Sequence, residues 1–300
     1  ILEAGGNAYD AILAGLMMTP LSEPVLTSLG GGGHMLSHTA TGGAVVYDFF
    51  AHTPRSKKLD TSEVHFYPAT ADFGTVTQDF HIGMGSIAVP GIIKGIFEIH
   101  RDLGSLPMSR IVEPAIRGAR EGVVIDPLQA NIIDIVEPIF RSTPESEKQY
   151  VSPITKGALL RAGDRYVNRE YADFLALLSK EGDDLFYKGD VAHQIVNDVR
   201  AGGGYLTRDD LAQYEVMRRD PLKVDYRNNT FITNPPPSSG GILIAFALKV
   251  LEACDVGESI RRSEYLKLLA RVMRETNKAR AEELDGNVCK PGVCERFLDP

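Results

Sequence analysis

The strand-like segments of this 300-residue chain come as adjacent pairs, and the helical segments come in blocks between the pairs. Residues 35–39 and 44–50 have strand-like composition on either side of a glycine turn, which predicts a hairpin. Residues 222–226 and 230–233 predict a second hairpin around an asparagine turn. A doubly wound parallel sheet needs strands and helices that alternate along the chain. The pattern therefore favours an α+β fold.

Helices are predicted where apolar residues recur at helical spacing and a capping residue precedes them. Asn7 caps the first helix, which is apolar on nearly every face and is expected to be buried. Thr207 and Asp210 form a capping-box pattern at another helix start. Ser238 and Ser239 precede a long apolar helix, and either a capping role or a role in a site explains them. The predicted helices span residues 8–18, 90 or 91–103, 108–121, 171–180, 191–200, 208–214, 240–253 and 263–284.

Composition excludes several functional classes. The chain is 43% hydrophobic and 24% charged, as in globular proteins, so it is neither wholly disordered nor fibrous. Its net charge is −8 and its basic residues form no long block, which argues against a nucleic-acid or anionic-membrane partner. No apolar run is long enough for a bilayer span. The chain opens with Ile1, so we expect that a segment has been removed upstream, and cytoplasmic and periplasmic locations both stay open.

The three cysteines are too few for a disulfide framework. Cys289 and Cys294 flank a proline–glycine turn, and a bridge, a zinc site and two reduced thiols are all compatible with this spacing. Reduced thiols are the simplest of these, and Cys254 on an apolar helix is expected to be a small core residue. No metal or organic cofactor is predicted.

Glycine is clustered, and the longest cluster is the run of four at residues 30–33. No Lys-Ser/Thr follows this run and a strand comes next, so we predict a tight backbone crossing rather than a phosphate-binding loop. His34 and His38 lie on the strand that follows, without carboxylates placed to complete a metal site.

No complete set of catalytic residues is present in the sequence. There is no G-x-S-x-G elbow, and around Ser86 in GMGSIAVPG the two required glycine places hold Met84 and Ala88. The pairs Asp183-Asp184 and Glu282-Glu283 are interpreted as ordinary charges that flank helices or face solvent.

Several segments in a fixed order nevertheless carry a resemblance that covers the chain from residue 1 to about residue 283. They read ILEAGGNAYDAILAG, LGGGGHM, YDFFAHTPRS, GMGSIAVPG, FYKGDVAHQI, GGGYLTRDDLAQY and NPPPSSGGILIAFALKVLE. In these segments the chain resembles the large subunit of the γ-glutamyltranspeptidase family. The proline–serine–glycine segment and the four-glycine run are the most specific of them.

The resemblance implies an N-terminal nucleophile hydrolase with a four-layer αββα sandwich. Residues 1–300 are then a large subunit, one structural unit completed by a small subunit from the same self-cleaved precursor. The nucleophile, an N-terminal threonine activated by its own α-amine, lies on the small subunit. No catalytic residue is therefore expected in this chain, and the expected partners are the small subunit and a small amide substrate.

The family places a substrate-binding arginine in a segment that reads approximately D-F-R-E-x-A-P. Residues 48–54 read DFFAHTP here, so Phe50 occupies the arginine position. A phenyl ring cannot replace a bidentate contact from arginine to a carboxylate, and we expect γ-glutamyl amides to be poor substrates. His52 and Arg55 are candidates for a substitute contact. Two readings remain open beside an enzyme for another amide: γ-glutamyl transfer with a different clamp, and a non-catalytic binding relative that has lost processing.

Overall fold

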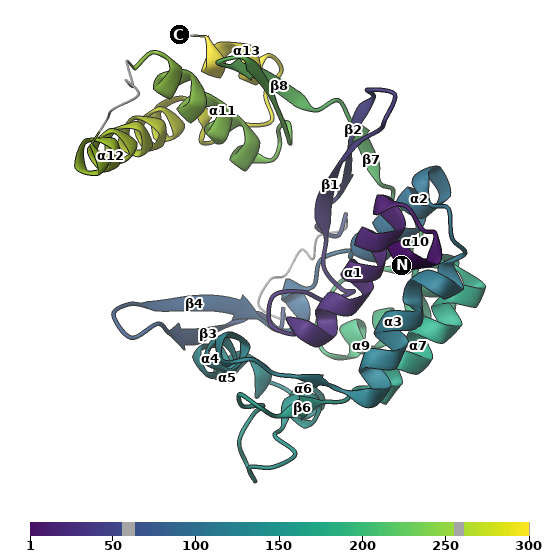
Figure 1. Ribbon diagram of the computed structural model, residues 1–300. Helices are drawn as coiled ribbons and strands as arrows, with labels where there is room; N and C mark the ends of the chain where they lie inside the picture. The colour runs from purple at the N-terminus through teal and green to yellow at the C-terminus, as the bar shows by residue number, and fades with distance from the viewer. Residues whose placement is uncertain (56–63, 255–260, 300) are drawn as a thin grey trace. The chain divides into compact units, whose positions relative to one another are not determined.

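A computed structural model describes residues 1–55, 64–254 and 261–299 (Figure 1). Contacts within the chain divide it into two compact units. The first unit comprises Ile1–Gly33 and Phe49–Val216, and the second comprises His34–Asp48 and Met217–Pro300. Each unit has a hydrophobic cluster of its own. Among the described residues, every helix is too short or too polar to cross a lipid bilayer.

The first unit is mostly helical. Helix α3 (Met108–Glu121) packs against both α1 (Ala8–Ser22) and α7 (Arg169–Glu181) (Figure 1). The helices of this unit are α1 (Ala8–Ser22), α2 (Ile92–Leu103), α3 (Met108–Glu121), α4 (Pro127–Ile135), α5 (Glu137–Phe140), α6 (Pro144–Tyr150), α7 (Arg169–Glu181), α8 (Asp184–Tyr187), α9 (Asp190–Ala201) and α10 (Arg208–Ala212), with 3₁₀ turns η1 (Leu2–Ala4) and η2 (Met84–Ser86). Two antiparallel strand pairs complete it, β3 (Tyr67–Asp72) with β4 (Thr77–Ile82) and β5 (Val123–Val124) with β6 (Arg165–Tyr166).

The start of α1 is fixed by the capping interaction that the sequence predicts. Asn7 accepts from the backbone amide of Asp10, and the Asp10 carboxylate accepts from the amide of Asn7, each at 2.9 Å. Helix α1 is buried at Leu13, Met17 and Leu21, but Ile12 is 50% exposed, so the prediction of a buried helix holds for only part of its surface. The reason is that α2 and α3 contact α1 and leave part of its surface open.

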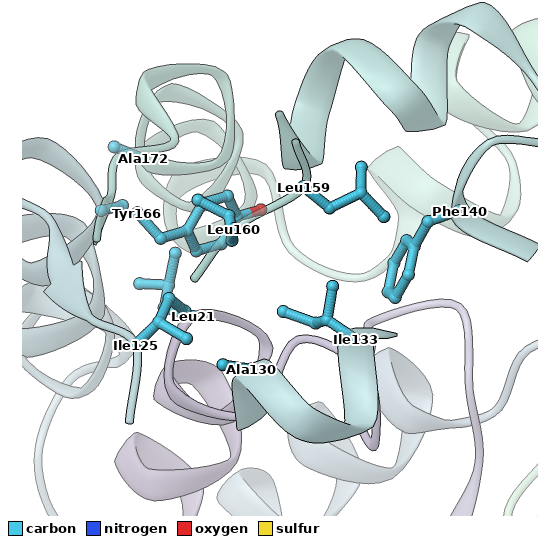
Figure 2. Packing of buried hydrophobic residues seen from close by; sticks show 10 residues of the cluster. Leu21, Ile125, Ala130, Ile133, Phe140, Leu159, Leu160, Tyr166 and Ala172 are labelled. Carbon is cyan, nitrogen blue, oxygen red and sulfur yellow. The ribbon is translucent and has the colours of Figure 1, made fainter. Parts of the chain in front are cut away.

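One hydrophobic cluster of the first unit joins α1, α4 and the segment around β6 (Figure 2). Aliphatic side chains from elements far apart in sequence, including Leu21, Ile133 and Leu160, exclude solvent from its centre. Burial of each such side chain contributes about 1.5–3 kcal/mol relative to exposure.

The second unit combines two small sheets with helices. Strands β1 (Gly33–His38), β2 (Ala44–Phe49) and β7 (Met217–Arg219) form a sheet in the order β1-β2-β7, with β7 antiparallel to β2. Strands β8 (Leu222–Tyr226) and β9 (Asn229–Thr233) form an antiparallel hairpin. The helices are α11 (Ser239–Glu252), α12 (Arg262–Ala279), its π-helical continuation η3 (Arg280–Leu284), and α13 (Val293–Leu298).

The mixture of hairpins and helical blocks confirms the predicted α+β class. The two predicted hairpins and the predicted helices are present, with boundaries that differ by a few residues. Ser238 does precede α11, but its side chain makes no capping hydrogen bond, so of the two explanations left open for this serine the structure does not support capping.

Candidate functional site

The segment 49–55, which follows β2, contains the three residues that the sequence singled out for substrate binding. Its backbone is held in place by a short antiparallel pairing. The amide of His52 donates to the carbonyl oxygen of Val89 at 3.1 Å, and the amide of Val89 donates to the carbonyl oxygen of His52 at 2.7 Å. Both bonds are local to the first unit, so the segment is anchored at its centre.

Glycines surround the beginning of this segment because no side chain fits there. A Cβ atom on Gly32 would lie 2.4 Å from the backbone nitrogen of Ala51, and one on Gly91 would lie 2.0 Å from the carbonyl oxygen of Phe49. The carbonyl oxygen of Gly31 accepts from the amide of Gly91 at 2.9 Å. The four-glycine run is therefore a close crossing of backbones at the start of α2, as the sequence predicts.

Tyr214 contacts two of the three candidate residues. Its hydroxyl donates to the carbonyl oxygen of Phe50 at 2.8 Å, and its ring lies 4.9 Å from the ring of His52 at an angle of 48°. Tyr214 is itself buried, with 3% of its surface exposed, whereas Phe50 is 57% exposed. The backbone of Phe50 is thus fixed from inside the unit while its phenyl ring faces outward.

Helix α10 holds the third candidate residue. The backbone amide of Arg55 donates to the carboxylate of Asp210 at 2.9 Å, and its guanidinium donates to the side-chain oxygen of Gln213. The structure therefore places Arg55 along α10. The single stretch 210–214 contacts all three candidates, Phe50, His52 and Arg55.

Asp210 is ionised more readily than an ordinary aspartate. Burial by itself raises the pKa of its carboxyl, but hydrogen bonds from the Thr207 side chain and from the amides of Arg55 and Thr207 outweigh this, and the pKa is lowered. A carboxylate that accepts several hydrogen bonds is stabilised in its charged form. Asp210 therefore performs two tasks, capping α10 and holding the end of the 49–55 segment.

A second buried tyrosine, Tyr187, packs against Tyr214. The ring of Tyr187 stacks on that of Tyr214 at 5.8 Å and 16°, and its hydroxyl donates to the carbonyl oxygen of Pro90 at 2.8 Å. Burial raises the pKa of Tyr187, so the hydroxyl stays protonated and remains a donor. Lys94 lies over this ring and forms a 2.7 Å ion pair with Asp183. Asp183 is the residue that precedes α8, so it flanks a helix as the sequence predicts, and its side chain is paired and only 14% exposed.

Asp48, immediately before the segment, belongs to the second unit. It is 2% exposed, and its carboxylate lies 2.7 Å from Nε of Arg219 on β7 and 3.2 Å from Nε2 of His34 on β1. One buried carboxylate therefore links the three strands of the β1-β2-β7 sheet. The His34 ring nitrogen thus contacts this buried carboxylate.

Neither a metal centre nor a disulfide is found in the described parts of the chain. Across residues 1–55, 64–254 and 261–299, no three His, Cys, Asp or Glu side chains converge in a way that holds a metal ion. Cys254, Cys289 and Cys294 are free thiols, so of the alternatives for the last two the structure has reduced thiols. Cys254 is only partly buried.

Comparisons with known proteins agree with this architecture. The family model described as gamma-glutamyltranspeptidase matches residues 1–300. The chain is 32% identical over 257 residues to the acylase ACY 1 proenzyme of Pseudomonas sp. strain V22, covering 86% of this chain and 46% of that protein. It is 31% identical to the glutathione hydrolase proenzyme of Escherichia coli strain K12, covering 85% of this chain and 43% of that protein.

Solved structures show the same fold. The γ-glutamyltranspeptidase of Helicobacter pylori superposes with a TM-score of 0.81 at 28% identity, over 99% of this chain and 83% of that chain. The enzyme of Pseudomonas nitroreducens superposes with a TM-score of 0.82 at 26% identity, over 100% of this chain and 86% of that chain. The fold is thus that of a class of hydrolases and transferases. Within that class, the chain belongs to the gamma-glutamyltranspeptidase family. It spans about half the length of the curated relatives that it matches.

The contacts of Tyr214 and Asp210 were not predicted from the sequence. The sequence predicts a capping box for Thr207 and Asp210, which the structure confirms, but the bond from the Arg55 amide to Asp210 spans 155 positions. Tyr214 marked only the end of a short helix. No local pattern carries such long-range contacts.

Proposed function

We propose that this chain is the large subunit of a self-processing amidohydrolase or acyltransferase, and that a small subunit from the same precursor completes an αββα sandwich around it. Membership of the family supports this, as does the description of its relatives as proenzymes.

In the proposed reaction, the N-terminal threonine of the small subunit attacks the carbonyl carbon of a small amide through its hydroxyl oxygen. The threonine α-amine accepts the hydroxyl proton and passes it to the leaving amine as the C–N bond breaks. The product is an ester-linked acyl-enzyme. Water or an amino acid then attacks this ester, releases the acyl group and restores the threonine.

The observation that carries the substrate proposal is the exposed phenyl ring of Phe50. It occupies the position at which the family motif has arginine, and the side chains of the two nearby candidates, His52 and Arg55, contact Tyr214 and Gln213. A carboxylate without a partner in a closed site loses about 1–3 kcal/mol of interaction. We infer that the acyl group bound here lacks the α-carboxylate of a γ-glutamyl group, in keeping with the similarity to an acylase.

The test is hydrolysis of four p-nitroanilides by the full-length gene product. Their acyl groups are γ-glutamyl, 4-aminobutyryl (which lacks the α-carboxylate), glutaryl (which lacks the amine) and butyryl (which lacks both). We expect higher kcat/KM for 4-aminobutyryl or butyryl than for γ-glutamyl. A preference for γ-glutamyl would overturn the substrate assignment, and hydrolysis of none would favour a binding protein that has lost activity.

A further inference from the structure

The carbonyl oxygen of Phe50 is held by one side-chain hydroxyl, that of Tyr214, at 2.8 Å. Peptide groups on both sides of this carbonyl are confined as well. Gly91 leaves room for the Phe49 carbonyl and for the Tyr214 hydroxyl, since a Cβ there would lie 2.0 Å from the first and 2.1 Å from the second. On the other side of the carbonyl, a Cβ on Gly32 would lie 2.4 Å from the backbone nitrogen of Ala51. The Tyr214 hydroxyl therefore occupies space that a side chain at position 91 would take.

The direction of a side chain follows from the orientation of its own peptide groups. Phe49 is buried and its ring packs on Gly95, whereas the ring of the next residue, Phe50, is 57% exposed. Successive residues of extended chain point to opposite sides. A bond that fixes the Phe50 carbonyl therefore also fixes the direction in which the exposed ring projects.

We propose that Tyr214 is a positioning residue for substrate specificity, which acts by holding the Phe50 carbonyl so that the phenyl ring is presented to the acyl group. This rests on the proposed function, because it assumes that Phe50 contacts substrate. Tyr214 is buried and needs no contact with substrate itself.

The chain offers a matched control in Tyr187. Both tyrosines are buried, their rings stack, and each hydroxyl donates to a backbone carbonyl at 2.8 Å. The acceptor for Tyr187 is Pro90, outside the 49–55 segment. Tyr214→Phe and Tyr187→Phe thus remove the same group from the same stack, and only the first removes the hydrogen bond to the Phe50 carbonyl.

The first test is a double-mutant cycle on the anilide panel. We expect Tyr214→Phe to change the ratio of kcat/KM between butyryl and γ-glutamyl anilides by about tenfold, mainly through KM, as a lost positioning hydrogen bond allows. Tyr187→Phe should leave this ratio unchanged. In a Phe50→Ala background, Tyr214→Phe should have no further effect on the ratio, because no ring remains to be positioned. Additive effects, or equal effects of the two tyrosine changes, would overturn the proposal.

A second test does not depend on activity. With 4-fluorophenylalanine placed at position 50 of the full-length protein, the fluorine resonance should shift or broaden in Tyr214→Phe and stay in place in Tyr187→Phe. An unchanged resonance in Tyr214→Phe would refute the positioning role. If no anilide is hydrolysed, the proposed function fails, and this comparison still decides what Tyr214 does.

Discussion

The amide of Arg55 donates to the carboxylate of Asp210 at 2.9 Å, across 155 positions of sequence. This bond joins the end of the 49–55 segment to the first turn of α10. Asp210 is also part of the capping box of α10. The same residue that caps this helix, together with Tyr214, therefore holds the candidate substrate-binding segment. The contribution of these contacts to protein stability and their effect on substrate specificity can therefore be measured separately.

Asp210→Asn should lower the stability of the protein by about 1–3 kcal/mol, because the charged acceptor of several buried hydrogen bonds is lost. The folded-state pKa of Asp210 lies below its ordinary value of 3.8. Its stabilising contribution is then fully present above pH 3.8 and declines as the pH falls through the lower, folded-state value. Thermal unfolding should be measured from pH 7 to pH 3. The difference in midpoint temperature between wild type and Asp210→Asn should narrow only at the acid end of this range. A difference that is constant with pH would contradict the assigned charge.

Phe50→Arg should raise kcat/KM for the γ-glutamyl anilide by about tenfold or more, since a bidentate contact of this kind gains about 1.5–3 kcal/mol. The 4-aminobutyryl anilide, which has no α-carboxylate, should gain nothing. Phe50→Gln, of similar length and neutral, is the matched control. No gain for the γ-glutamyl anilide in the arginine variant would count against the assignment of position 50.

Gly91→Ala should destabilise the protein by about 1–3 kcal/mol or more, because the added methyl group overlaps the Phe49 carbonyl and the Tyr214 hydroxyl. The backbone of Gly91 has a φ of −113°, which alanine adopts, so the effect is steric. Gly15→Ala inside α1 is the control, since nothing lies within 4 Å of its added Cβ. Thermal midpoints should fall for the first variant and hold or rise for the second. Equal midpoints would show that the crossing is less tight than described.

Asp48→Ala should cost about 3–5 kcal/mol, because it leaves Arg219 and His34 without their shared buried carboxylate. Asp173→Ala breaks a comparable ion pair with Arg120, but both side chains there are more than half exposed. Such exposed pairs contribute little. In urea unfolding, the midpoint of Asp48→Ala should therefore lie clearly below that of Asp173→Ala. Similar midpoints would exclude a structural role for the contacts of Asp48 with Arg219 and His34.

Sequence patterns predicted those elements whose signals are local. The capping residue Asn7 and the glycine turn before Ala44 fixed a helix start and a hairpin, and both are present. The β3–β4 hairpin was missed because its inward positions are Ala69 and Ala71, which have low strand propensity and small apolar surface.

For the candidate site, the sequence singles out the 49–55 segment but not the contacts around it, for the same physical reason. The family motif located the 49–55 segment, because motif residues are contiguous. The contacts that shape it, from Val89, Gly91 and Tyr214, come from segments about 40 to 160 residues away and follow only from the fold. The role of Phe50, His52 and Arg55 in binding substrate stays a prediction.

The most direct test of the account is intact mass measurement with N-terminal sequencing of the purified full-length gene product. The proposed self-processing predicts two chains, one of which contains the sequence printed here and the other of which begins with threonine. A single uncut chain would contradict it, because the threonine α-amine that serves as the base would never be released.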